Sequence, residues 1–414
     1  MSNELERAYA PWKLGPLTLR NRFIKSATNE GNAPGGTPTQ ALVRHHRSMA
    51  AGGVGMTTVA YCAVSADGRT FEDQVMLGPA SRPHLRAVTD AVHAEGAAAC
   101  AQVTHGGAFN FLSKLSTSSP VSASGGLNPP GFLSGRVFRH AASASELRSL
   151  REQFVQGARE ARAAGFDAVE IHMGHGYLLS QFLSPAYNRR RDEYGGSAQR
   201  RARFPSEVLA AVLDAVGAHM GVSCKISIFE GMRGGATVDD AIVTAQTMAS
   251  AGAHLIVNSA GMNVESPWHI FGSAMPEGIG GENASAMMRF GNRMLKWQQP
   301  PIEFQPLYLL QAARRIRAQV RAPLAYLGGV TSVDDIRSAI AEGFDAIVVG
   351  RALIHRPDLL LAFRSGELSR SGCDHCNRCV ALMYSAGGTR CALTSREDIA
   401  ANRTPAATAD QPVG

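Results

Sequence analysis

The feature that most constrains the fold of this chain is a repeated unit, in which a helix-like stretch ends at a glycine and a short apolar stretch follows within a few residues. Glycine at the end of a helix adopts the left-handed conformation that closes the last turn. Two of the units continue almost identically, as Gly-Phe-Asp-Ala-Val and Gly-Phe-Asp-Ala-Ile. The pattern predicts helices that alternate with buried strands. The closing glycines are Gly53, Gly96, Gly165, Gly252 and Gly343.

Several of the expected helices also carry a recognisable start. Ser143 and Glu146 have the spacing of a capping box, followed by apolar residues at helical intervals. The runs Thr-Val-Asp-Asp from Thr237 and Ser-Val-Asp-Asp from Ser332 each place a hydroxyl group at the N-cap and acidic groups in the first turn. Both features stabilise a helix N-terminus, so these residues mark where helices begin.

Eight apolar stretches between these helices are expected to be strands. Most are short continuous runs, as is typical of parallel strands that are buried on both faces. Eight strands that alternate with helices predict a (β/α)8 TIM barrel with insertions. An open doubly wound sheet is the alternative, and it is less favoured because no glycine-rich dinucleotide turn follows the first strand. The expected strands are 22–28, 56–64, 98–105, 168–173, 222–228, 254–260, 323–329 and 346–351.

Composition excludes several classes of protein. Hydrophobic residues make up 45% of the 414 residues and charged residues 18%, which supports a large core and excludes a disordered or fibrous chain. No apolar run approaches the length of a membrane span, and the N-terminus lacks the apolar core of a signal peptide, so a cytoplasmic location is expected. The net charge of +7 is spread along the chain. We therefore expect neither a nucleic-acid nor a membrane partner.

Two long connections and a distinct C-terminal region complete the expected organisation. Connections 106–142 and 261–304 follow strands, so they are expected on the catalytic face, where they cover a substrate or contact another subunit. The barrel is expected over 1–365, a cysteine-rich segment over 366–395 and a disordered tail over 396–414. A homo-oligomer is expected.

Two imidazoles and a phenol converge at the end of the fourth expected strand. His172 lies at the strand end, His175 lies just beyond it, and Tyr177 follows two residues later. Histidine can donate a hydrogen bond to a carbonyl oxygen and tyrosine can deliver a proton, so the group is suited to an oxygen-bearing substrate. A metal pair is a second interpretation, although no third ligand follows at a suitable spacing. A third is that these side chains only satisfy one another.

The last two expected strands end in residues that suit a phosphate group. Gly328 and Gly329 end the seventh strand, and Gly350 and Arg351 end the eighth. Glycines allow backbone N–H groups to approach a phosphate, and arginine pairs with it. Barrels often bind phosphate at this position, so a phosphate site is predicted here.

Four of the seven cysteines are clustered near the C-terminus with the spacing C-x2-C-x2-C-x11-C. Three thiolates at short even spacing, completed by a distant fourth, suit a 4Fe-4S cluster. Structural zinc sites more often use two C-x2-C pairs, and zinc or a vacant remnant remain alternatives. The four expected metal ligands are Cys373, Cys376, Cys379 and Cys391.

Residues 168–204 contain two runs that match one family signature in order. The first run comprises His172, His175, Gly176, Tyr177, Leu178, Leu179, Gln181, Phe182, Leu183, Ser184 and Pro185. The second comprises Asn188, Arg190, Asp192, Tyr194, Gly195, Gly196 and Ser197. So many matches in one order are highly specific. The segment resembles the signature of the Old Yellow Enzyme family of FMN-dependent oxidoreductases, and the resemblance extends over about residues 11–360.

The resemblance implies that FMN binds in the barrel. Gln102 corresponds to the residue that bonds the flavin pyrimidine, and Lys225 to the cation that stabilises the anionic reduced flavin. Asn29 stands where the family often has threonine or cysteine, so redox tuning by a cysteine at that position is excluded. The expected cofactor-binding residues are Ser26, Ala27, Thr28, Asn29, Ala60, Gln102, Lys225, Gly328, Gly329, Gly350 and Arg351.

The activity implied by the resemblance is that of an ene-reductase. NAD(P)H would reduce FMN, His172 and His175 would bond the carbonyl oxygen of an α,β-unsaturated substrate, and Tyr177 would protonate the α-carbon after hydride transfer from flavin N5. The cysteine spacing resembles that of the 2,4-dienoyl-CoA reductase and trimethylamine dehydrogenase branch, whose additional C-terminal region a chain of this length is expected to lack. That branch implies an alternative, a dehydrogenase or demethylase that passes electrons through a 4Fe-4S cluster to a partner protein. A flavin-free binding module is the third possibility.

Overall fold

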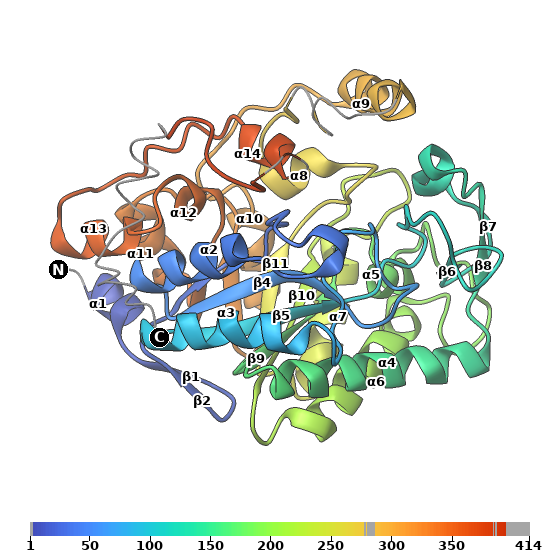
Figure 1. Cartoon of the computed structure of the whole chain (residues 1–414), viewed down its shortest axis with the longest axis horizontal. Helices are drawn as coiled ribbons and strands as arrows, with labels where there is room; N and C mark the ends of the chain where they lie inside the picture. The colour runs from blue at the N-terminus through green and yellow to red at the C-terminus, as the bar shows by residue number, and fades with distance from the viewer. Residues whose placement is uncertain (1–2, 277–278, 280–285, 384, 386, 395–414) are drawn as a thin grey trace, which may run out of the picture.

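The computed structural model describes residues 3–276, 279, 286–383, 385 and 387–394, and within them eight parallel strands close into a barrel (Figure 1). The first strand pairs with the last, with Phe23 opposite Ile347, so the sheet has no open edge. The predicted (β/α)8 architecture is confirmed. The barrel strands are β3 (Phe23–Lys25), β4 (Met56–Ala63), β5 (Ala98–Thr104), β9 (Ala168–Met173), β10 (Gly221–Ser227), β11 (Leu255–Ser259), β12 (Leu324–Leu327) and β13 (Ala346–Val349).

Each barrel strand falls inside a predicted stretch or overlaps it closely, with informative differences at the ends. Residues 26–28 were expected to continue the first strand, but the chain leaves the sheet after Lys25. Gly350 was expected to lie in the last strand, and instead it is the N-cap of α12 (Arg351–His355). In both places the strand ends at the rim formed by the carboxyl ends of the strands, and the residues that follow line a cavity instead of continuing the sheet.

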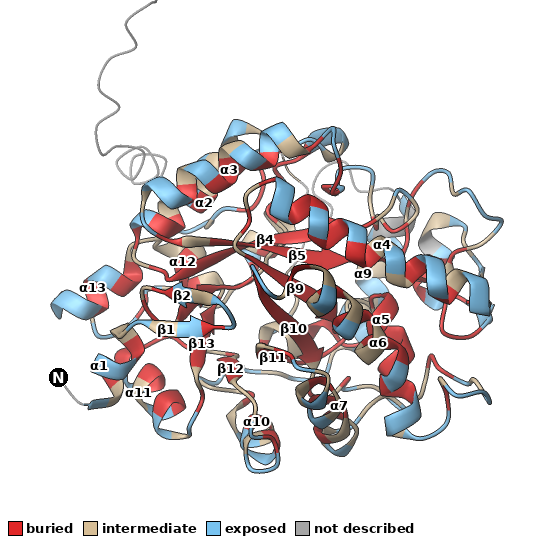
Figure 2. Cartoon of the chain, turned by 90° about the horizontal axis from the view of Figure 1, so that it is seen from below, coloured by how far each residue is buried: buried red, intermediate tan, exposed pale blue. Residues whose placement is uncertain are grey.

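Helices cover the outside of the barrel, and Figure 2 shows buried strands beneath helices whose outer faces are exposed. The five glycines that were expected to end helices all have positive φ, between 71° and 100°. Capping boxes are present at α4, α7 and α11, as the hydroxyl and acidic residues indicated. The larger helices that follow barrel strands and pack around them are α2 (Gln40–Ala51), α3 (Arg82–Ala94), α4 (Ala144–Ala163), α6 (Ala198–Val216), α7 (Val238–Ser250), α10 (Leu310–Arg317) and α11 (Val333–Ala341).

The amino end of the barrel is closed by a hairpin that was not among the predicted strands. It consists of β1 (Trp12–Leu14) and β2 (Leu17–Leu19), which pair in antiparallel fashion. Leu14 and Leu19 are buried and pack with apolar side chains of the barrel strands, including Ile24. Because apolar groups fill this end, a polar ligand can enter only from the opposite rim.

The two long connections contain short elements of their own. The first holds β6 (Val121–Ser122), β7 (Gly126–Leu127), the 3-10 helix η2 (Pro129–Ser134) and β8 (Phe138–Ala141). The second holds α8 (Pro267–Phe271) and α9 (Ala286–Gln298). The chain continues through α13 (Leu359–Ser365) to α14 (Arg378–Leu382). The expected tail 396–414 lies outside the described residues. In the described part of the chain, no helix is both long and apolar enough for a bilayer.

The capping box of α11 gives a direct test of the helix starts. Ser332 Oγ accepts a hydrogen bond from the Asp335 N–H at 3.1 Å. Replacing Ser332 by alanine leaves that N–H without its acceptor, so we expect the free energy of unfolding to fall by about 1 kcal/mol in urea titrations. Ser338→Ala, at an exposed position inside the same helix, is the matched control and should cost nothing. Equal stability of both variants would contradict this assignment of the cap.

Candidate functional site

A cavity of about 300 Å³ opens at the carboxyl ends of the barrel strands. All of the predicted catalytic and cofactor-binding residues line it, although they come from segments that are far apart in the sequence. The predicted phosphate-binding glycines line the same cavity as residues 26–29, because β12 pairs with β13 and β13 pairs with β3. No Asp or Glu is among the described residues that line the cavity, whereas Lys225 and Arg351 are. This charge balance suits an anionic ligand.

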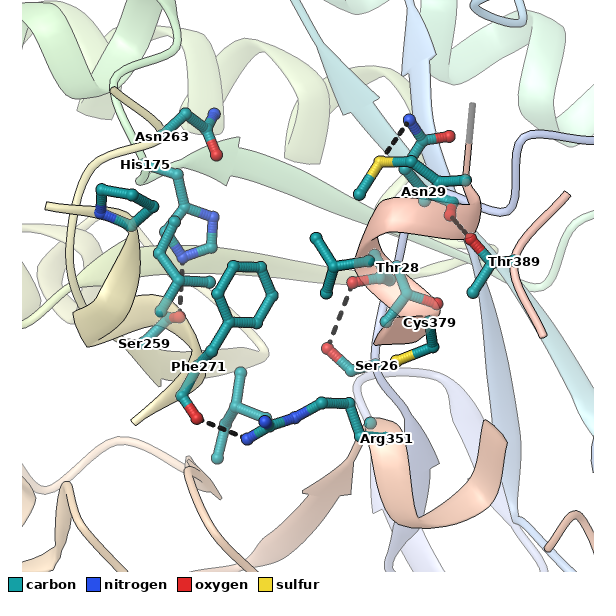
Figure 3. A pocket seen from close by; sticks show the side chains of 18 of the residues that line it. Ser26, Thr28, Asn29, His175, Ser259, Asn263, Phe271, Arg351, Cys379 and Thr389 are labelled. Atoms are coloured by element: carbon teal, nitrogen blue, oxygen red, sulfur yellow. Dashed lines mark hydrogen bonds between the residues drawn. The ribbon is translucent and has the colours of Figure 1, made fainter. Parts of the chain in front are cut away.

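The two histidines at the end of β9 form a hydrogen-bonded pair. His172 Nε2 lies 3.0 Å from His175 Nδ1, and His175 Nε2 lies 2.7 Å from the hydroxyl of Ser259 on β11 (Figure 3). His175 has a φ of 61°, and its N–H donates to Ser227 Oγ. Both ring nitrogens of His175 therefore have partners, while the buried Nδ1 of His172 has none. The interpretation that these side chains only satisfy one another's hydrogen bonds therefore holds for His175 but not for His172.

Burial determines the charge of this pair. It lowers the pKa of His172 well below its usual range, and repulsion by Lys225, and by His175 whenever that imidazole is protonated, adds to the shift. It lowers the pKa of His175 to about 3, again with a contribution from Lys225. Both imidazoles are therefore neutral near pH 7, and each carries one N–H and one acceptor nitrogen.

Tyr177 lies beside the histidine pair within an aromatic wall. It is the N-cap of α5 (Leu178–Leu183), which holds its backbone at the start of a buried helix. Its ring centroid lies 4.4 Å from that of His172, 5.7 Å from Tyr61 and 5.6 Å from Phe109. The phenol is thus placed next to the imidazoles on an apolar surface.

The buried cation on the cavity floor is held by its neighbours on adjacent strands. Lys225 on β10 lies 2.9 Å from Glu170 Oε1 on β9, and both side chains are almost completely buried. The same carboxylate oxygen accepts a hydrogen bond of 2.7 Å from Gln102 on β5. Glu170 itself does not line the cavity. It therefore orients the amide and the ammonium group, which do.

The predicted phosphate region combines open backbone with a tethered arginine. Gly328 and Gly329 have φ values of 134° and 76°, and a Cβ at Gly329 would lie 2.8 Å from the Leu307 backbone nitrogen. Arg351 donates to Ser273 Oγ at 2.9 Å and to the Phe271 carbonyl (Figure 3). Backbone without side chains, a cation and a cavity without carboxylates fit the phosphate of FMN.

Residues of the second long connection form much of the remaining wall, and the sequence did not identify them individually. The first long connection contributes Phe109 alone among the described lining residues. The connection 261–304 was expected to cover a substrate, and it does face the cavity. Its lining residues are Asn263, Pro267, Ile270, Phe271, Met275, Ile279, Asn292 and Leu295.

The cysteine-rich segment also reaches the cavity, through Cys379, Val380, Met383 and Thr389 among others. Asn377, which is buried and has a φ of 58°, accepts a 2.5 Å hydrogen bond from Arg351. These contacts link segments separated by tens to hundreds of residues, which no local pattern could reveal. The segment is therefore part of the wall that holds the predicted phosphate-binding arginine.

The four clustered cysteines lie close enough together for their charges to interact, but they are not preassembled around a metal. Burial raises the pKa of Cys379 to about 11; the charge of Arg351 opposes this shift and the thiols of Cys373, Cys391 and Cys376 add to it. Within the described residues, no group of three or more His, Cys, Asp or Glu side chains is arranged to hold a metal ion. The geometry does not support the predicted 4Fe-4S or zinc site.

The histidine pair predicts a specific pH dependence of stability. An exposed imidazole has a pKa of about 6.5, so below that pH the unfolded chain binds a proton that folded His175 excludes. The free energy of unfolding should therefore fall as the pH is lowered from about 7 to about 5, and His175→Asn should remove about 1 kcal/mol or more of that loss. His84→Asn, at an exposed position on α3, is the control for urea titrations across this range. Parallel pH profiles of wild type and His175→Asn would exclude a buried neutral His175.

Comparison with known proteins agrees with this geometry. The model of the NADH:flavin oxidoreductase / NADH oxidase family matches residues 7–274. The chain is 38% identical over 395 residues to the 4,4'-dithiodibutanoate disulfide reductase of Rhodococcus erythropolis, and the match covers 93% of this chain and 94% of that protein.

Solved structures share the fold. A 2-naphthoyl-CoA reductase complex superposes with a TM-score of 0.79 at 22% identity, and the match covers 97% of this chain and 58% of that one. The Old Yellow Enzyme homologue from Zymomonas mobilis superposes with a TM-score of 0.69 at 21% identity, covering 89% of this chain and 95% of that one. The family match and the relative show that the chain belongs to the NADH:flavin oxidoreductase / NADH oxidase family, and the solved structures, among them an Old Yellow Enzyme homologue, share its fold.

Proposed function

We propose that the protein is an FMN-dependent reductase that uses NADH or NADPH to reduce the C=C bond of α,β-unsaturated carbonyl compounds. The observation that carries the proposal is the position of His172, His175 and Tyr177 in the same cavity as the residues expected to hold FMN. Membership of the family supplies the flavin and the nicotinamide. The neutral imidazoles and the adjacent phenol supply groups that can bind and protonate a carbonyl substrate.

The residues that would hold FMN divide between its two ends. Arg351 and the backbone of Gly328, Gly329 and Gly350 would bind the phosphate, and Gln102 and Lys225 would face the pyrimidine. When bound, FMN accepts a hydride from the nicotinamide and passes it to the second substrate. Lys225 would stabilise the negative charge of the reduced pyrimidine, since its ammonium group is buried and its ion pair with Glu170 holds it at the cavity.

The substrate would bind through its carbonyl oxygen. A neutral imidazole N–H of His172 or His175 donates to that oxygen. The carbonyl oxygen then replaces one of the acceptors in the hydrogen-bonded series His172, His175 and Ser259. This donation withdraws electrons from the alkene. The aromatic wall excludes water, and the Tyr177 phenol delivers a proton to the α-carbon while the β-carbon receives the hydride. The product is the saturated carbonyl compound, and solvent returns the proton to the tyrosine.

A second candidate acceptor is an organic disulfide. It is favoured by one observation, the 38% identity over almost the full length of both chains to a 4,4'-dithiodibutanoate disulfide reductase. In that reaction the S–S bond would be broken by a hydride equivalent, which carries two electrons and one proton. Tyr177 or a histidine would donate the second proton, so that two thiols leave. The same proton donors serve both acceptors, so the acceptor class has to be measured.

The electron-transfer alternative is weaker. It requires a cluster that carries electrons to a partner protein, and the described cysteines do not form a preassembled ligand set. No step of the proposed reaction passes through a metal.

The proposed role of Tyr177 predicts a split between the two half-reactions. Tyr177→Phe removes the proton donor but keeps the ring, so we expect acceptor reduction to slow by about 100-fold or more while flavin reduction by NADPH keeps its rate. Anaerobic stopped-flow absorbance follows each half-reaction separately. Unchanged reoxidation by an enone would remove Tyr177 from the role of proton donor.

The acceptor class can be decided with one enzyme preparation. We expect reduced wild-type enzyme to be reoxidised by 2-cyclohexenone about tenfold or more faster than by 4,4'-dithiodibutanoate at equal concentration, because the histidine pair is suited to a carbonyl oxygen. The reverse order would identify the protein as a disulfide reductase. A trial with trimethylamine in place of NADPH tests the dehydrogenase alternative, and no flavin reduction is expected.

A further inference from the structure

A buried ion pair lies directly behind the cavity wall and has no part in the proposed reaction. Lys25 Nζ lies 2.5 Å from Glu30 Oε1, and the two side chains are 0% and 3% exposed. Burial lowers the pKa of Lys25 and raises that of Glu30, and the attraction between the two groups opposes both shifts. Removing either partner would leave an unpaired group in the interior, which is strongly unfavourable.

The position of this pair in the chain is informative. Lys25 is the last residue of β3, and Glu30 follows after four residues, Ser26 to Asn29. Each of these four residues lines the cavity. The ion pair thus joins the two ends of a short arch whose intervening residues face the expected flavin. A cross-link at the base of such an arch restricts its conformations before a ligand binds.

The same carboxylate holds a second part of the wall. Its other oxygen, Glu30 Oε2, accepts a hydrogen bond of 3.2 Å from the backbone N–H of Ala60, which also lines the cavity. Ala60 lies where the register between β4 and β5 shifts, between Val59 and Cys62, so the strand pairing is irregular at this point. Glu30 therefore replaces a regular sheet contact and ties the arch to β4.

Further contacts from β4, α2 and the C-terminal segment surround the ion pair. Lys25 Nζ also donates to the Thr58 carbonyl at 3.3 Å. On α2, His46 Nε2 lies 3.6 Å from Glu30 Oε1, and its Nδ1 lies 2.8 Å from Thr57 Oγ1. Burial lowers the pKa of His46 well below its usual range, so it adds no positive charge near pH 7. The main-chain oxygen of Glu30 accepts from the N–H of Thr389 in the C-terminal segment at 2.7 Å.

We propose that Lys25 and Glu30 form a clasp that holds residues 26–29 and Ala60 in the conformation that binds FMN, so that Glu30 is a positioning residue of the cofactor site. The inference rests on the proposed function in one respect, that FMN occupies this cavity. Glu30 acts through the backbone of the arch and of β4, and it contacts neither cofactor nor substrate.

The test measures FMN affinity of the apoprotein by flavin fluorescence quenching. Glu30→Gln breaks the clasp but leaves the Lys25 ammonium unpaired, so the double variant Lys25→Met/Glu30→Gln is included, which removes both charges. Glu160→Gln is the matched control, since Glu160 is a largely buried carboxylate paired with Arg82 at 2.8 Å and does not line the cavity. Thermal unfolding is recorded for every variant.

The clasp predicts that Glu30→Gln and the double variant both weaken FMN binding by about tenfold or more, because preorganisation of the wall is lost in each. The double variant should recover much of the thermal stability that Glu30→Gln loses, while Glu160→Gln keeps wild-type affinity. A double variant that regains wild-type FMN affinity together with its stability would show that the pair is only structural, and it would overturn the proposal.

Hydrogen–deuterium exchange of the apoproteins gives a readout that does not depend on flavin. Peptides that cover residues 26–30 and Ala60 should exchange about tenfold faster in the double variant than in wild type or Glu160→Gln. Equal exchange would overturn the clasp even if Glu30→Gln alone fails to fold. If wild-type apoprotein binds no FMN, the proposed function fails, and the exchange comparison alone decides whether the clasp orders the arch.

Discussion

Closure of the barrel between its first and last strands is the constraint on which the site depends. The pairing of β13 with β3 places Ser26, whose N–H donates to the Val349 carbonyl at 2.8 Å, next to the start of α12. It thereby joins an arch from the beginning of the chain to Gly350 and Arg351 from its end. Since parallel strands share one direction, each contributes its carboxyl end to the same rim, and apolar packing of the hairpin β1–β2 closes the other.

Two buried ion pairs hold the polar groups at this rim in place. Lys225 and Glu170 orient one another inside the barrel, and Lys25 and Glu30 do so behind its wall. In the first pair Lys225 lines the cavity and Glu170 does not. In the second pair neither side chain lines the cavity, but residues 26–29, which lie between Lys25 and Glu30 in the sequence, do. Buried ion pairs contribute little net stability, so their value here is geometric: they hold neighbouring polar groups in one arrangement within an otherwise apolar core.

The sequence predicted the parts of this molecule that depend on local chemistry. The glycine repeat, the helix caps and the apolar runs located the eight strands, and the strand ends located His172, His175 and Arg351 on one rim. Contacts between distant segments were not predictable in this way. Asn377 against Arg351, Thr389 against Glu30 and Ser259 against His175 depend on how the barrel brings remote loops together, and no spacing along the chain encodes them. The cysteine spacing indicated a metal, but the described side chains do not assemble a site.

The proposed FMN-dependent reduction is tested most directly by the visible absorption spectrum of anaerobically purified protein before and after addition of NADPH. An FMN-dependent reductase shows a flavin band that bleaches on addition of the nicotinamide and returns on addition of an enone. A protein without a flavin band, or with a flavin that neither NADPH nor NADH reduces, would contradict the proposed function. A broad additional absorption that fades together with the flavin band would instead assign the cysteine-rich segment to an iron–sulfur cluster and favour the electron-transfer alternative.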